Sequence, residues 1–316
     1  MVDSTVISKP QEVRISEVIE LLKPRVMSLV IFTAFIGMII APTGINPIIA
    51  LASLIFIAIG AGGSGALNMW WDEDIDRLMK RTRNRPVPTG TVSGEDARLL
   101  GLWCSGFAIF MLALTANFLA AGILAFTIFF YVVVYTMYLK RRTAQNIVIG
   151  GAAGAFPPLI GWAVVTNGIA LEPILLVLLI FLWTPPHFWA LALVTKEEYS
   201  LAKVPMLTVT RGERVTRRYI FWYSLSLIPI GFMIAFSSIG GPLTLGLVIV
   251  LNIMLTLGSY QVMTRDTEDS ASDGYNREKA LFKLSIWYLF VMFAGLGVES
   301  MLHAFYEPYL VWPELF

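Results

Sequence analysis

Residues 47–85 read PIIALASLIFIAIGAGGSGALNMWWDEDIDRLMKRTRNR, and this stretch decides the fold class. Its first part, Pro47 to Trp70, is a nearly uninterrupted apolar block. A helix needs roughly 20 such residues to cross the hydrocarbon core of a bilayer, so this block is long enough. The chain then turns acidic and afterwards strongly basic, which is typical of a spanning helix that ends at a membrane surface.

The rest of the chain repeats this alternation of apolar blocks and charged segments. Of the 316 residues, 57% are apolar and only 14% are charged, and a soluble domain of this length would not concentrate them in this way. We therefore predict an all-α polytopic membrane bundle of about nine transmembrane helices. The predicted spans are Val26–Ala41, Pro47–Trp70, Leu99–Asn117, Phe118–Leu139, Ile147–Val165, Ile174–Val194, Tyr219–Phe236, Leu243–Val262 and Leu281–Leu302.

The basic residues predict the orientation of the bundle. All 23 Lys and Arg lie in residues 9–25, 77–98, 140–142, 196–218 and 265–283, which are the N-terminal segment and every second loop. Lys and Arg near helix ends stay on the cytoplasmic side. We therefore expect the N-terminus and these loops to be cytoplasmic, the C-terminus to be outside, and the functional surface to be cytoplasmic.

The spans divide the chain into three parts. Residues 1–25 form a cytoplasmic segment, in which Pro10–Leu22 is expected to lie on the membrane surface as an amphipathic helix. Residues 26–302 form one transmembrane domain, and residues 303–316 form an external tail. The short N-terminus with several acids favours a bacterial or archaeal plasma (inner) membrane over a mitochondrial one. The single cysteine excludes a disulfide framework, and nothing in the sequence predicts nucleic acid as a partner.

The end of the second predicted span carries the first candidate site. Asn68, Asp72 and Asp76 are spaced i, i+4 and i+8, so a helix places them on one face. Asp74 points to the other side of that helix and is expected to pair with a basic residue. Carboxylates one turn apart repel each other, and a hard cation such as Mg²⁺, which takes oxygen ligands, would offset that repulsion.

Basic residues follow this acidic stripe directly. Arg81, Arg83 and Arg85 have guanidinium groups that suit bidentate contact with phosphate. Acidic stripe and arginine cluster together predict a site for a metal-bound diphosphate. The alternative is an ordinary solvated cap at the membrane surface.

Two further clusters lie on the same predicted side. His187 is about seven residues inside the end of the sixth span, and an ionisable residue at that depth is a functional candidate, or else a packing residue beside Pro185 and Pro186. Glu197 and Glu198 follow it as candidate metal ligands or as an exposed loop pair. Lys140 and Arg141, between the fourth and fifth spans, either bind phosphate or only anchor the topology.

These residues resemble the UbiA superfamily of intramembrane prenyltransferases. The Asn68, Asp72 and Asp76 stripe followed by RTRNRP at 81–86 is similar to the first motif of that superfamily. In relatives the second acidic motif carries aspartates, an acid often replaces Met69, and a small residue replaces Lys203. The segments that resemble the haem-farnesylating branch are LKPRV at 22–26, YLKRRT at 138–143, GAFPPLIGW at 154–162, PPHFW at 185–189 and VPML at 204–207.

The resemblance implies Mg²⁺-dependent transfer of a farnesyl group from farnesyl diphosphate to a vinyl group of haem B, which gives haem O. Haem O serves terminal oxidase assembly, so haem A synthase or oxidase assembly factors are candidate partners. The implied roles are metal binding for Asn68, Asp72, Asp76, Glu197 and Glu198, catalysis for Asp72, Asp76 and His187, and diphosphate binding for Arg81, Arg83, Arg85, Lys140 and Arg141.

Two details of this chemistry stay open at the level of the sequence. His187 is either the base for the final addition of water or a contact to the haem. Trp70, Trp71 and Trp189 are expected to be available for cation–π contact with a farnesyl cation.

Two other functions fit parts of the sequence. A UbiA-type enzyme that acts on a quinone precursor or a lipid head group shares the first motif, but it should lack PPHFW. A secondary transporter would place its ionisable residues near the bilayer midplane, between two repeats, whereas the acids here cluster at one surface.

Overall fold

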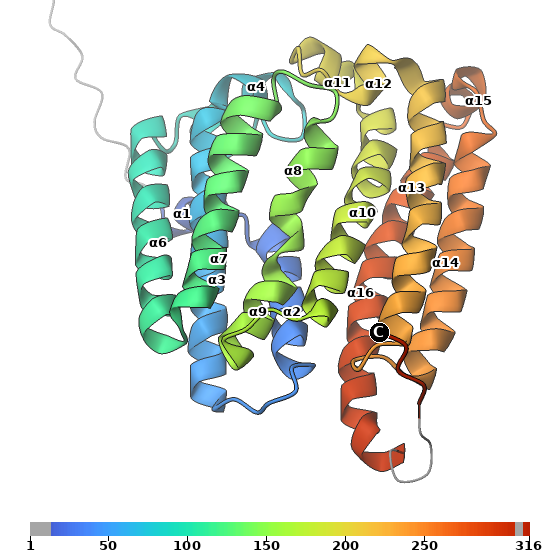
Figure 1. The fold of residues 1–316 in the computed structure, drawn as a ribbon. Helices are drawn as coiled ribbons and strands as arrows, with labels where there is room; N and C mark the ends of the chain where they lie inside the picture. Colours follow the sequence, from blue (N-terminus) through green and yellow to red (C-terminus); the bar gives the residue numbers. More distant parts are fainter. Residues whose placement is uncertain (1–13, 307–311) are drawn as a thin grey trace, which may run out of the picture.

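The structure, a computed structural model, describes residues 14–306 and 312–316, and within these ranges every regular element is helical. The predicted all-α membrane bundle is thereby confirmed. Figure 1 shows the long helices standing side by side in one bundle. They are α2 (Pro24–Ile39), α3 (Pro47–Trp71), α6 (Gly94–Thr115), α7 (Phe118–Phe129), η1 (Phe130–Leu139), α8 (Asn146–Ala155), α9 (Pro157–Thr166), α10 (Leu171–Val194), α13 (Gly212–Ala235), α14 (Pro242–Met263) and α16 (Asn276–Tyr306).

Short helices occupy the predicted cytoplasmic loops. Figure 1 shows four of them, α4, α11, α12 and α15, gathered at one end of the bundle. The alternating basic loops predict that these segments lie on one side of the bundle. The short helices are α1 (Ile15–Leu21), α4 (Glu73–Leu78), α5 (Pro86–Thr89), α11 (Lys196–Leu201), α12 (Leu207–Thr210) and α15 (Thr267–Ser272).

Eight helices in the described part of the chain are long and apolar enough to cross a membrane. They overlap the predicted second to ninth spans, and the largest difference is at the seventh span, which begins at Gly212 and not at Tyr219. The predicted first span corresponds to α2, whose apolar part, Met27–Ile39, is shorter than a full crossing. Nine spans and the outside C-terminus therefore stay predictions. The first residues of the expected interfacial helix, 10–13, and residues 307–311 of the expected tail lie outside the described residues.

Two predicted single helices are divided in the structure. The fifth span breaks between α8 and α9, because Pro157 has no N–H to continue the helical hydrogen bonds. The fourth span changes from an α-helix to a ten-residue π-helix, η1, and Lys140 N correspondingly donates to Tyr135 O five residues back.

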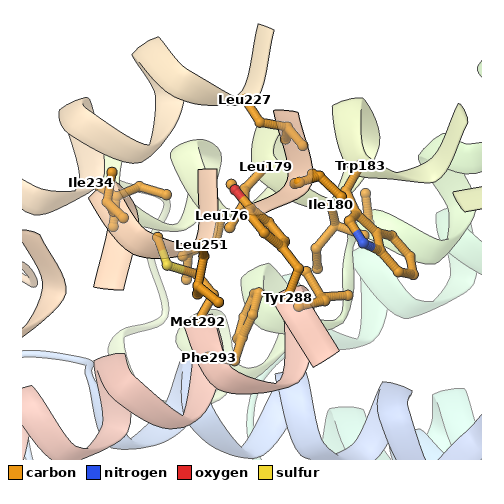
Figure 2. Packing of buried hydrophobic residues seen from close by; sticks show 14 of the residues in the cluster. Leu176, Leu179, Ile180, Trp183, Leu227, Ile234, Leu251, Tyr288, Met292 and Phe293 are labelled. Carbon is orange, nitrogen blue, oxygen red and sulfur yellow. The ribbon is translucent and has the colours of Figure 1, made fainter. Parts of the chain in front are cut away.

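The buried core has two halves that meet at the centre of the bundle. One half joins α10, α13, α14 and α16, and Figure 2 shows Trp183, Leu227, Leu251 and Phe293 among the side chains that fill it. The other half joins α2, α3, α6, α7 and α9. In the most apolar stretch of each span, 72% of the residues are buried in α8–α9 and 61% in α10, against 28% in α7–η1. The helices α8, α9 and α10 therefore form the central wall.

Helices α2 and α9 approach each other through glycines. A Cβ on Gly37 would lie 2.2 Å from Pro158 O, and a Cβ on Gly161 would lie 2.0 Å from Ala34 O. Small residues allow helix backbones in membranes to come this close. Pro158 and Gly161 of the GAFPPLIGW segment thus have a structural role, which is the close packing of α9 against α2.

We expect Gly161→Ala to destabilise the protein, because the backbone oxygen in the way cannot move without shifting α2. Overpacking of this kind costs about 1–3 kcal/mol, and it should appear as a lower Tm of the purified protein in detergent. Gly246→Ala is the matched control, since no atom lies within 4 Å of a Cβ at that position in α14. An equal Tm for the two variants would contradict the packing argument.

Candidate active site

The acidic stripe lies where α3 passes into α4. Although α3 ends at Trp71, Asp72 N donates to Asn68 O at 3.0 Å and Asp76 N donates to Asp72 O at 2.8 Å. The helical spacing therefore continues across the joint, and the three side chains share one face as predicted. Asn68, Asp72 and Asp76 are 6%, 0% and 3% exposed. The stripe faces the interior of the protein, so it is not a solvated cap.

Each buried carboxylate has a basic partner. Asp72 Oδ2 accepts hydrogen bonds from Lys140 Nζ at 2.5 Å and from Asn68 Nδ2 at 2.8 Å. Asp76 Oδ2 pairs with Arg85 Nη1 at 2.6 Å. Buried charges are stable only when they are paired and hydrogen-bonded, so these contacts hold the stripe together in the absence of any ligand.

Asp74 points away from the stripe, as predicted. Its side chain is 66% exposed and binds the guanidinium of Arg141 through both oxygens, at 2.6 and 2.7 Å. The hydrogen bonds from Arg141 lower the pKa of Asp74. Arg141 also lies 3.7 Å from Asp72 Oδ1, so it stands at the edge of the buried stripe.

The five predicted diphosphate-binding residues fall into two groups. Arg85, Lys140 and Arg141 contact the acidic residues directly. Arg81 and Arg83 are exposed and make no side-chain hydrogen bond or ion pair with the described part of the chain. They lie on the same short connection as Arg85, at the outer surface.

The π-helix η1 places Lys140 and Thr136 beside the stripe. Thr136 is fully buried, and its hydroxyl accepts a hydrogen bond from Asn68 Nδ2 at 3.0 Å. Tyr131 and Tyr135 lie on the same π-helix and stack with ring centroids 5.8 Å apart. π-Helical turns recur at functional sites, and nothing in the apolar sequence of this span indicated one.

Lys23 is a site residue that sequence reasoning missed. It precedes α2 with a left-handed backbone, φ 52°, and its Nζ donates to Asn68 Oδ1 at 2.6 Å. Burial, with the nearby charge of Arg85, lowers the pKa of Lys23 to about 7. The sequence assigned this lysine to topology alone. The available signal was LKPRV at 22–26, which contains Lys23 and resembles the haem-farnesylating branch.

The second candidate cluster is divided between two places. Glu198 in α11 is half-buried and its Oε2 is sealed from solvent without a hydrogen-bond partner, whereas Glu197 is exposed. His187 packs within α10 and against α16, where its Nδ1 lies 2.7 Å from Ser285 Oγ. None of its contacts is to Asp72 or Asp76, so the structure does not bring His187 onto the acidic stripe.

One of the three tryptophans differs from the expectation. Trp189 is 0% exposed and packs edge-on against Tyr219 and Tyr223, so it is not available to a substrate cation. Trp70 and Trp71 line a surface hollow of about 370 Å³ together with Asp74 and Arg141.

The donor set fits one kind of metal site. No group of three or more His, Cys, Asp or Glu in the described ranges is spaced to hold an ion alone. Two buried oxygens, Asp72 Oδ1 and Glu198 Oε2, have no hydrogen-bond donor. Mg²⁺ keeps only one or two protein carboxylates and takes its other ligands from substrate phosphates. The residues therefore fit a cation that arrives with a diphosphate.

Comparisons with known proteins show the family to which the chain belongs. The model of the UbiA prenyltransferase family matches residues 30–299. A protein from Cereibacter sphaeroides called protoheme IX farnesyltransferase is 56% identical over 302 residues, which is 96% of this chain and 97% of that protein. A protein of the same name from Paracoccus denitrificans is 54% identical over 299 residues, 95% of this chain and 98% of its own length.

Solved structures share the fold at low identity. A structure described in work on digeranylgeranylglyceryl phosphate synthase in membranes has a TM-score of 0.72 at 14% identity and covers 90% of this chain and 98% of its own. A UbiA homologue from Archaeoglobus fulgidus bound to DMAPP and Mg²⁺ has a TM-score of 0.64 at 15% identity, over 87% of this chain and 99% of its own. The chain therefore belongs to the UbiA prenyltransferase family, in the group of the protoheme IX farnesyltransferases, and is a membrane prenyltransferase.

Proposed function

We propose that this enzyme transfers a farnesyl group from farnesyl diphosphate to a vinyl group of haem B and so makes haem O. The buried stripe of Asn68, Asp72 and Asp76, faced by Lys140 and Arg85, is the observation that carries the diphosphate chemistry. The acceptor is inferred from the relatives, which share the name protoheme IX farnesyltransferase at 54–56% identity over nearly their full lengths.

In this proposal, substrate binding gives the basic residues of the stripe a new ion-pair partner, the diphosphate, in place of the carboxylates. Asn68, Asp72 and Asp76 would hold Mg²⁺ when it is bound, and Glu198 of α11 would be a further ligand. Glu197 is left out of this set because its side chain is exposed. Lys140 and Arg85 turn from their carboxylates to the diphosphate, while Arg81, Arg83 and Arg141 face its outer side. Bound Mg²⁺ supplies Lewis-acid neutralisation of the leaving group.

The chain's own residues then favour ionisation of the allylic C–O bond. Both bonding electrons leave with the diphosphate, and the positive charges of Lys140 and Arg85 stabilise it as the farnesyl cation forms. Tyr131 and Tyr135 offer aromatic faces to that cation, and the apolar helices exclude water from it. The vinyl π-electrons of the haem form the new C–C bond, and addition of water with loss of a proton gives the hydroxyl group.

The membrane side belongs to the same proposal. The basic loops support a cytoplasmic site in the plasma (inner) membrane of a bacterium, since Lys and Arg near helix ends are retained there. Both named relatives come from bacteria. Haem O made at this site would pass to haem A synthase or to oxidase assembly factors.

Pigment extraction tests the function directly. The chain is expressed in cells that make haem B but no haem O, and the extracted haems are analysed by mass spectrometry. We expect a new haem with the mass of haem O, and none from a matched strain carrying Asp72→Ala. A prenylated quinone or lipid without haem O would instead support the prenyltransferases that act on those acceptors.

The two neighbouring aspartates should differ sharply in importance. Asp72→Asn removes a buried charge from the stripe. It should lower kcat by about 100-fold or more, because the Asp72 carboxylate lies where charge develops in the proposed reaction. Asp74→Asn removes only a surface ion pair, which is worth about 0–1 kcal/mol, so kcat should stay within a few-fold. Both variants are compared at equal amounts of detergent-purified protein with matched Tm. Similar losses in the two would refute the assignment of the stripe.

The two neighbouring glutamates provide a second comparison. If Glu198 completes the metal site, Glu198→Gln should raise the Mg²⁺ concentration for half-maximal activity by on the order of tenfold or more. Glu197→Gln changes an exposed side chain and should shift it far less. Activity is titrated with Mg²⁺ at saturating farnesyl diphosphate. An unchanged Mg²⁺ requirement in Glu198→Gln would remove that residue from the metal site.

A further inference from the structure

His187 is held in one orientation by aromatic rings and by Ser285. The imidazole lies between Trp183, with ring centroids 4.4 Å apart, and Phe282, at 4.6 Å, and both neighbouring rings are nearly parallel to it. Trp183 Nε1 also donates to the backbone oxygen of Ser285 at 2.7 Å. This polar contact between α10 and α16 fixes both ring positions.

The hydrogen bonds of Ser285 are compatible with the metal-binding tautomer of His187. The Ser285 hydroxyl oxygen lies 2.7 Å from Phe282 O and 2.7 Å from His187 Nδ1. When its one hydrogen is directed to Phe282 O, the same oxygen accepts from Nδ1–H, so Nδ1 carries the proton. A neutral imidazole with its proton on Nδ1 has a free lone pair on Nε2. That is the form in which histidine binds metals.

The side chain of His187 leaves α10 on a face that other helices surround. Trp183 contacts α16 and Thr184 contacts Gly151 of α8. His187, four and three residues further along, projects between these two directions. Helix α2 packs against both α9 and α16, so α8–α9, α10, α16 and α2 enclose this direction. His187 is only 9% exposed, yet its Nε2 has no hydrogen-bond partner among the described residues and is not sealed by packing.

We propose that His187 Nε2 is the axial ligand to the iron of the haem substrate, and that Ser285 is the positioning residue that holds this nitrogen ready. The proposal rests on the proposed function and adds the site at which the porphyrin is held. An iron porphyrin has a metal that accepts a neutral imidazole and an apolar face, and the edges of the rings stacked on His187 would border that face.

A role as general base fits the surroundings less well. A base becomes imidazolium, and the contacts of His187 with Trp183, Phe188, Phe282 and an uncharged hydroxyl include no carboxylate that would pair with a buried positive charge. Ligation leaves the ring neutral. Mg²⁺ prefers oxygen ligands, so the magnesium of the acidic stripe is not the metal that this nitrogen takes.

The test uses the full-length protein in detergent, with haem B as the added probe. The ferrous complex of the wild type should show the iron–imidazole stretching band in resonance Raman spectra. In His187→Gly the band should disappear and the dissociation constant for haem B should rise by about tenfold or more, and added imidazole should restore the band.

Ser285→Ala tests the positioning role with the histidine still present. Loss of the acceptor for Nδ1–H should weaken haem binding and shift the iron–imidazole band, because the partner of the second nitrogen tunes the ligand. Ser224→Ala is the matched control. Ser224 is equally buried and also donates to a backbone oxygen in its own helix, but it does not touch a histidine. This control should bind haem like the wild type.

The outcomes separate the inference from the function on which it rests. A wild type that makes haem O without an iron–imidazole band, or a band that persists in His187→Gly, overturns the inference and leaves the function intact. Loss of haem O with unchanged haem binding in His187→Gly would assign the residue to proton transfer and also overturn it. A wild type that neither binds haem B nor makes haem O refutes the proposed function together with the inference.

Discussion

Two buried carboxylates one helical turn apart, Asp72 and Asp76, dictate how one end of this protein is assembled. Buried like charges are tolerated only beside cations, and removal of one partner leaves the other uncompensated. The partners come from different segments: Lys140 from the end of η1, Arg85 from the connection before α5, and Lys23, through Asn68, from the start of α2. The requirement for charge balance thus ties three parts of the chain to α3. It also leaves the site with cations and anions already in place for a metal-bound diphosphate.

The central wall of α8, α9 and α10 supports the rest of the site. These helices are the most buried in the bundle, and α9 is fixed to α2 by backbone contacts at Gly37 and Gly161 that leave no room for a side chain. On α10, the faces that pack against α13 and α16 are filled by the core side chains drawn in Figure 2. His187 emerges at the edge of that packed surface. A rigid wall with one neutral ring nitrogen left open is suited to hold a flat substrate at a fixed distance from the acidic stripe.

Much of the fold and part of the site were predictable, because they depend on local relations along the chain. Each predicted span overlaps a helix or a pair of helices, since apolar length is read directly from the sequence; several helices begin five to seven residues earlier, in charged segments. The common face of Asn68, Asp72 and Asp76 followed from helical spacing alone. The surface pairing of Asp74 followed for the same reason. The pair Pro157–Pro158 is evident in the sequence, but it lies inside one long apolar block. That block therefore predicted a single helix and not the observed break.

The sequence by itself determined the helices, the charged end and the acidic stripe, because residues a few positions apart set these features. Only the tertiary structure decided which cations serve the stripe: it selected Arg85 over Arg81, added Lys23, and buried Trp189 where a substrate cannot reach it. It also introduced the π-helical turns before Lys140 and joined His187 to Ser285, 98 residues further on. The physical reason is that these contacts depend on how distant helices pack. The period of a helix fixes the face on which a side chain lies, but not the partner that it meets there.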